Sequence, residues 1–187
     1  MMFKKEDFIA LNSLQEVQQM SWRDFEWFCK FLLESIGYDS VSVTSSKYDG
    51  GVDNIAFKNG EKVFVQDKHW SKYGSRKKRY VPVEIVRALA GSMQQKSVKK
   101  GIVIATVPVF EQAKREARKL NIEIIDLEKL KLLLKSIKPN FDVTETQPTP
   151  RKKVLKYLIT HKELVRFQWV ISILFASFVY LLIRIYN

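Results

Sequence analysis

The sequence predicts an α/β fold in which helices cover both faces of a central mixed sheet, followed by a separate hydrophobic helix at the C-terminus. Short β-rich runs alternate with segments whose apolar residues recur at helical spacing. A polar stretch with three prolines interrupts this order, and an uncharged stretch lies beyond it. The expected divisions are an N-terminal extension (1–20), a main domain (21–137), a Pro-rich linker (138–150), a basic juxtamembrane segment (151–166) and a transmembrane helix (167–186).

The first half of the main domain is predicted to be a helix followed by three strands. Apolar residues recur every three or four positions over residues 22–36, between Ser21 as a suitable N-cap and Gly37 as a stop. Asn59 and Gly60 form a turn-like pair between two β-rich runs, which indicates a hairpin. The three expected strands cover residues 40–44, 51–57 and 62–68.

The second half of the main domain alternates helix and strand. Residues 101–106 are a continuous apolar run, typical of a strand that is buried on both faces. The other expected elements are helices over residues 83–95, 110–120 and 127–137 and a strand over residues 122–126. Such an order requires helices on both faces of the sheet.

Composition and charge restrict the class of protein. The chain has 187 residues, with 32 Lys and Arg against 20 Asp and Glu, and its formal charge of +12 favours polyanionic partners such as nucleic acid or an anionic membrane surface. Cys29 is the only cysteine, which excludes an intrachain disulfide. The N-terminus lacks the uninterrupted apolar core of a secretory signal, so we expect the main domain to remain in the cytoplasm.

The C-terminal stretch is expected to span a membrane. Residues 167–183 carry no charge, and Arg166 and Arg184 bracket them. Basic residues are frequent before this stretch, which places the main domain on the cytoplasmic side by the positive-inside tendency. The alternative is a helix buried in a core or packed on a partner. Residues expected to face or border the bilayer include Trp169, Leu174, Phe178 and Leu182.

Residues able to bind a metal gather around the predicted hairpin. Asp53 ends the run DGGVD, whose two glycines allow a tight turn or close approach to a phosphate. Side chains alternate along a strand, so Gln66 and Lys68 should share one face and Asp67 should project to the other. An acid and an amide oxygen could thus meet a lysine near Asp53, and phosphodiester cleavage needs oxygen ligands that converge with a cation.

The order of these residues resembles the Mrr-like branch of the PD-(D/E)xK restriction endonuclease superfamily. The likeness rests on Glu26 in DFEWFCKFLLESIGY, on DGGVD, on Gln66-Asp67-Lys68, and on EIVRALAGSM and KGIVIAT. It implies a restriction-endonuclease-like fold and Mg²⁺- or Mn²⁺-dependent cleavage of foreign duplex DNA. Together with the C-terminal stretch, it predicts an enzyme attached to a bacterial inner membrane. It also implies that Asp53, Gln66 and Glu26 are metal ligands and that Lys68 orients or activates the water.

Two positions depart from the family pattern. Asp67 stands where such proteins usually have a small or apolar residue, and a dry, unpaired carboxylate would be costly there. We therefore expect Asp67 to be solvated or paired with a base, or to act as an alternative ligand if the strand bulges. Pro108 replaces a residue that is usually small and polar, which leaves the role of its loop open.

Nearby residues have simpler interpretations. His69 should face away from Lys68, and a single further histidine makes a zinc site implausible. Trp70 is expected to pack at the strand end, and Cys29 to be a buried structural thiol. A basic loop follows the proposed catalytic strand and either clamps DNA phosphates or is a solvated loop; its position favours DNA. Its basic residues are Arg76, Lys77, Lys78 and Arg79.

Other functions remain open from the sequence. Taken singly, a Gly-Gly-Val-Asp turn, a Gln-x-Lys strand or a helix glutamate is common, and only their combination is specific. The chain could keep the nuclease fold but bind DNA or a protein without cleavage, or it could be a membrane component of a larger assembly. A homodimer is expected because a double-strand cut usually needs two active sites, and a defence-system partner protein is a further expectation.

Overall fold

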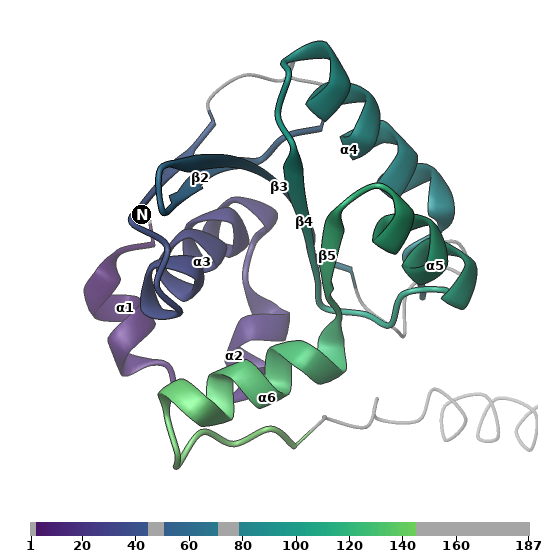
Figure 1. Ribbon diagram of the computed structural model, residues 1–187. Helices are drawn as coiled ribbons and strands as arrows, with labels where there is room; N and C mark the ends of the chain where they lie inside the picture. Colours follow the sequence, from purple (N-terminus) through teal and green to yellow (C-terminus); the bar gives the residue numbers. More distant parts are fainter. Residues whose placement is uncertain (1–2, 45–50, 71–78, 145–187) are drawn as a thin grey trace, which may run out of the picture. The chain divides into compact units, whose positions relative to one another are not determined.

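The computed structural model describes residues 3–44, 51–70 and 79–144. Its sheet has the strand order β1-β2-β3-β4-β5, seen nearly edge-on in Figure 1. The first three strands pair antiparallel, and β3, β4 and β5 pair parallel, so the predicted mixed sheet is confirmed. The strands are β1 (Ser40–Val43), β2 (Asn54–Lys58), β3 (Glu61–Lys68), β4 (Lys100–Ala105) and β5 (Ile122–Ile125).

Helices cover both faces of this sheet, as the alternating pattern predicts. Figure 1 shows α4 and α5 on one side and α3 and α6 on the other. The parallel strand pairs require crossovers, which α4 and α5 provide between β3, β4 and β5. The helices are α1 (Lys5–Ala10), α2 (Leu14–Gln19), α3 (Trp22–Ser35), α4 (Val83–Gln95), α5 (Glu111–Lys119) and α6 (Leu127–Ile137).

Strand β3 contributes to two hydrophobic cores. Val63 and Val65 lie in the core beneath α3, whereas Phe64 lies in the core beneath α4 and α5. Continued alternation directs Asp67 toward α3, and it directs Gln66 and Lys68 toward the opposite face. The end of β3 therefore carries polar side chains on both faces of the sheet, whereas the strand interior carries the two hydrophobic cores.

The packed unit extends beyond the boundaries expected from the sequence. Residues 1–20 were expected to be an extension, yet they contain α1 and α2, and Phe8 and Leu14 are buried in the α3-side core. Phe141 lies within the expected linker, but only 1% of it is exposed. Asp142 pairs with the same N-terminal region, since its carbonyl accepts from the backbone N–H of Leu14 at 2.7 Å. Both ends of the described chain thus close one core.

The expected membrane helix lies outside the described residues, as does the juxtamembrane segment. Across residues 3–44, 51–70 and 79–144, no helix has the length and apolar character needed to cross a bilayer.

The burial of Phe141 predicts a stability effect inside the expected linker. Phe141→Ala should lower the free energy of unfolding by about 3–5 kcal/mol, because a large side chain leaves a cavity in a packed core. Denaturant unfolding would measure the change. The control is Leu132→Ala in α6, where the leucine is 71% exposed and a change within about 0.5 kcal/mol is expected. Equal effects of the two substitutions would contradict the packing described here.

Candidate active site

Asp53 sits where the chain enters β2, next to the end of β3. Its backbone N–H donates to the carbonyl of Val65 at 2.8 Å. Its carboxylate oxygen Oδ2 accepts the backbone N–H of Asp67 at 2.7 Å and lies 4.0 Å from Nζ of Lys68. The hairpin therefore brings the predicted acid and the predicted lysine together.

Lys68 is held at the end of its strand by two contacts. Its Nζ also donates to the carbonyl of Asp67 at 3.1 Å, and its backbone carbonyl accepts the N–H of Thr106 at 3.1 Å. Thr106 in turn accepts the backbone N–H of Trp70 at 2.9 Å through its hydroxyl. The Thr106 bonds hold the backbone at the strand end, while the contact with the Asp67 carbonyl keeps the ammonium beside Asp53 and leaves 18% of the side chain exposed.

Gln66 is 4% exposed and lies against the glycine turn. A Cβ at Gly51 would come within 2.3 Å of its amide nitrogen Nε2, and Gly51 has φ +87°. The backbone angle therefore favours glycine at this position of DGGVD, and a larger residue would also displace the amide of Gln66. The amide oxygen Oε1 of Gln66 is buried without a hydrogen-bond partner in the described part of the chain. A buried oxygen in this state has a free lone pair for a cation or water.

Glu26 approaches the same end of the sheet from α3. Burial raises its pKa to about 7, with a further contribution from the charge of Asp53, while Arg23 and Lys68 oppose the shift. Burial also raises the pKa of Asp53, against the effects of the Asp67 N–H and of Lys68. The two acids are thus partly desolvated and repel each other electrostatically, and a bound cation would relieve this repulsion.

The donor set fits a hard divalent ion in its chemistry. Asp53 and Glu26 supply carboxylates, and Gln66 supplies an amide oxygen that nothing else in the described residues engages. Within those same residues, no group of three or more His, Cys, Asp or Glu is close enough to hold a metal. A site here would accordingly depend on the amide of Gln66 in addition to the two acids.

The expectation for Asp67 was wrong. This residue is only 8% exposed, and no base pairs with it among the described residues; its Oδ2 accepts a hydrogen bond from the side-chain amide of Asn54 at 2.6 Å. Burial, followed by the charge of Asp53, raises its pKa well above the usual range. The carboxyl therefore lies in the α3-side core as a hydrogen-bonded polar group.

Asn54 was missed by the sequence reasoning. It is fully buried, and besides Asp67 its amide donates to the backbone carbonyl of Glu26 at 3.2 Å. Its place directly after Asp53, two positions before the inward-facing Ala56, was the available signal. A polar residue at an inward position of a strand needs a buried partner.

The neighbouring residues agree with their structural interpretations. Cys29 is completely buried, and burial, with Asp67 nearby, raises the pKa of its thiol. The ring of His69 stacks on Phe25 with centroids 4.8 Å apart, and its Nε2 lies 2.7 Å from the carbonyl of Met20. Trp70 packs against the core beneath α4 and α5.

Only one residue of the predicted DNA-binding loop is described. Arg79 is exposed just before α4. Arg76, Lys77 and Lys78 lie outside the described residues.

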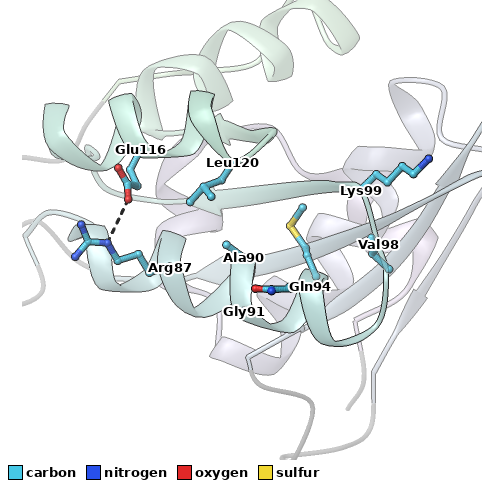
Figure 2. Close-up of a pocket in the computed structure, with 9 residues that line it drawn as sticks. Arg87, Ala90, Gly91, Gln94, Val98, Lys99, Glu116 and Leu120 are labelled. Carbon is cyan, nitrogen blue, oxygen red and sulfur yellow. Dashed lines mark hydrogen bonds and ion pairs between the residues drawn. The ribbon is translucent and has the colours of Figure 1, made fainter.

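A groove of about 540 Å³ lies elsewhere, between α4 and α5. Figure 2 shows Arg87 and Glu116 joined across it, with their charged atoms 3.4 Å apart. Lys99, which also lines it, precedes the start of β4, whereas Lys68 pairs with Ala105 at the opposite end of that strand. The groove is therefore separate from the candidate active site.

Comparison with known proteins supports the nuclease interpretation. The family Mrr_cat, described as a restriction endonuclease, matches residues 17–134, which is more than half of the chain. No curated protein matched the chain in a separate comparison.

Two solved structures share the fold. The DNA modification-dependent restriction endonuclease AspBHI has a TM-score of 0.56 and 19% identity, with 75% of this chain and 38% of that chain covered. The protein of unknown function AF1548 has a TM-score of 0.50 and 15% identity, with 60% of this chain and 64% of that chain covered. The chain thus spans less than two thirds of either protein.

The raised pKa of Glu26 predicts a pH-dependent stability. Its ordinary value is 4.5 and its folded value is about 7, so the folded state holds more protons in this interval and loses stability as pH rises through it. Glu26→Gln removes this loss. The free energy of unfolding of Glu26→Gln relative to the unmodified chain should therefore increase from about pH 4.5 to about pH 7, measured by denaturant unfolding with a chelator present.

The matched control is Glu61→Gln, at an exposed position of β3. For this variant, the stability difference from the unmodified chain should change little over the same pH range. Parallel stability curves for the unmodified chain and Glu26→Gln would contradict the burial of Glu26.

Proposed function

Because the chain belongs to the restriction endonuclease family, we propose that it is a metal-dependent endonuclease that hydrolyses phosphodiester bonds in foreign duplex DNA. The observation that carries this proposal is that Asp53 and Lys68 lie together at the end of the sheet, with Oδ2 of Asp53 4.0 Å from Nζ of Lys68. Glu26 and the amide oxygen of Gln66, which has no hydrogen-bond partner among the described residues, would complete the set of site residues. The match over residues 17–134 supports the reaction class.

Asp53, Gln66 and Glu26 would hold the divalent ion, Mg²⁺ or Mn²⁺. When bound, such an ion neutralises charge on the scissile phosphate and lowers the pKa of an attacking water. The partial burial of Asp53 and Glu26 suits this role, because desolvated carboxylates gain more from a nearby cation than exposed ones do.

Lys68 would orient the attacking water and stabilise the charge that develops on the phosphate. Its ammonium has three donors, and it contacts the Asp67 carbonyl and the Asp53 carboxylate. These two contacts restrict the ammonium to a position beside Asp53. A positive group preorganised in this way stabilises a transition state more than a mobile one.

The substrate is proposed to be duplex DNA, held largely through its phosphates. The formal charge of +12 supports this, as does the run Arg76, Lys77, Lys78 and Arg79 directly after the catalytic strand. Such contacts give affinity with little sequence information. A homodimer would supply the two active sites that a double-strand cut needs.

The enzyme is also proposed to be anchored in the bacterial inner membrane, with the nuclease domain in the cytoplasm. The support is the uncharged stretch 167–183 and the basic residues before it, both read from the sequence. Anionic lipid headgroups would contact that basic segment. This arrangement would place the nuclease close to DNA entering the cell.

Plasmid cleavage tests the proposed active site. The full-length protein in detergent should nick or linearise supercoiled plasmid with Mg²⁺ or Mn²⁺, and Asp53→Ala and Lys68→Ala should each reduce the rate by at least about 100-fold. Lys62→Ala is the control, because it removes an exposed lysine from the same strand. Cleavage unaffected by either site substitution would exclude this site, and salt-dependent DNA binding without cleavage under any divalent metal would favour a binding module.

Membrane fractionation tests the anchor. A chain that ends at Pro150 should move from the membrane to the soluble fraction, because it lacks the uncharged stretch. Extraction of the full-length chain with high salt distinguishes a membrane-spanning helix from electrostatic binding to lipid headgroups. Release by salt would contradict a spanning helix and indicate binding to lipid headgroups alone.

A further inference from the structure

Asn54 and Asp67 form a buried polar pair to which the proposed hydrolysis assigns no role. Asn54 lies on β2 and is fully buried, and Asp67 lies on β3 and is 8% exposed. Both side chains belong to the layer between the sheet and α3. Polar groups in such a layer reduce stability unless hydrogen bonds replace their contacts with water.

The pair links three separate parts of the candidate site. The amide of Asn54 donates to Oδ2 of Asp67 at 2.6 Å and to the backbone carbonyl of Glu26 at 3.2 Å. The backbone N–H of Asp67 donates to Oδ2 of Asp53 at 2.7 Å. The Asn54 side-chain amide thus joins β3 to α3 at Glu26, a predicted metal ligand. Asp67, its partner on β3, holds Asp53, the other acid of the site.

Resting on the proposed function, we propose that Asn54 and Asp67 are positioning residues that set Asp53 and Glu26 at the spacing a divalent cation needs. The bond to the Glu26 carbonyl fixes the rotation of α3 at that point. The bond between the two side chains fixes the end of β3, and the Asp67 N–H then orients the carboxylate of Asp53. Groups that orient metal ligands in this way commonly change metal affinity by about 10- to 100-fold when removed.

Core stability alone does not account for the pair. Apolar residues of similar size would fill the same space without the desolvation of two polar groups. The second carboxyl oxygen of Asp67, Oδ1, and the amide oxygen of Asn54 have no hydrogen-bond partner within the described residues. Two oxygens of the pair therefore lack hydrogen bonds among the described residues, which makes the pair costly as core packing. The connections of the pair to Asp53 and Glu26 supply a reason for its presence.

A double-substitution cycle on the full-length protein in detergent tests this inference. The variants are Asn54→Leu, Asp67→Leu and the two combined, with Asp67→Asn as the conservative variant because it keeps an oxygen acceptor for the Asn54 amide. Two responses to Mn²⁺ alone are measured: the metal concentration that gives half of the rise in Tm, and the concentration that gives half-maximal plasmid cleavage. The metal-free Tm reports folding, and Asn54→Ala replaces Asn54→Leu if that variant does not fold.

Each Leu variant should require about 10-fold more Mn²⁺ or higher, while Asp67→Asn stays close to the unmodified chain. The combined variant should lose less than the product of the two single losses, because the pair acts as a unit. The inference is overturned if folded Leu variants keep the unmodified response to Mn²⁺, even with a lowered metal-free Tm. It is also overturned if the two losses multiply, or if Asp67→Asn is as defective as Asp67→Leu.

The same measurements separate this inference from the proposed function. An unmodified chain that cuts DNA, with variants that respond normally to Mn²⁺, overturns the positioning role alone. An unmodified chain that gains stability with Mn²⁺ but cuts nothing overturns the nuclease function, and the Tm response still decides the positioning role. Absence of both Mn²⁺ responses in the unmodified chain overturns both.

Discussion

Two carboxylates, Asp53 and Glu26, are partly desolvated at one end of the sheet, and the candidate site depends on their arrangement. Burial raises the pKa of Glu26 to about 7 and that of Asp53 above its ordinary value. Lys68 and the Asp67 N–H offset part of this cost. A nearby cation would relieve two acids held in this state, which is the physical argument for the proposed metal dependence.

The mixed sheet explains why these groups meet. The β2–β3 hairpin brings Asp53 beside the end of β3, while the parallel pairing of β3 with β4 requires α4 on one face as a crossover. The opposite face is then left to α3, whose first turns carry Glu26. Polar side chains from two strands and one helix can converge only at the strand end, because the strand interior is buried under both layers.

Family membership and individual residues carry different information. The solved structures that resemble this chain share 15% and 19% identity with it, a level at which the likeness describes the fold. Asp67 within the Gln-x-Lys motif, and the Asn54 amide that donates a hydrogen bond to it, are properties of this chain's own packing. An apparent departure from the family pattern is matched by a buried partner 13 positions earlier, so the two residues are best understood together.

The sequence by itself determined the elements of the main domain, because periods of two and of 3.6 residues are local properties that a sufficiently long stretch displays. It also indicated that Asp53 and Lys68 lie near each other, since a hairpin and strand alternation suffice for that inference. Only the tertiary structure decided that Asp67 pairs with Asn54, that the pKa of Glu26 is raised by burial, and that Phe141 closes the core with α1 and α2. Each of these depends on contacts between distant segments and on the loss of water around them, and six-residue helices such as α1 and α2 are too short to display a period that reveals such contacts.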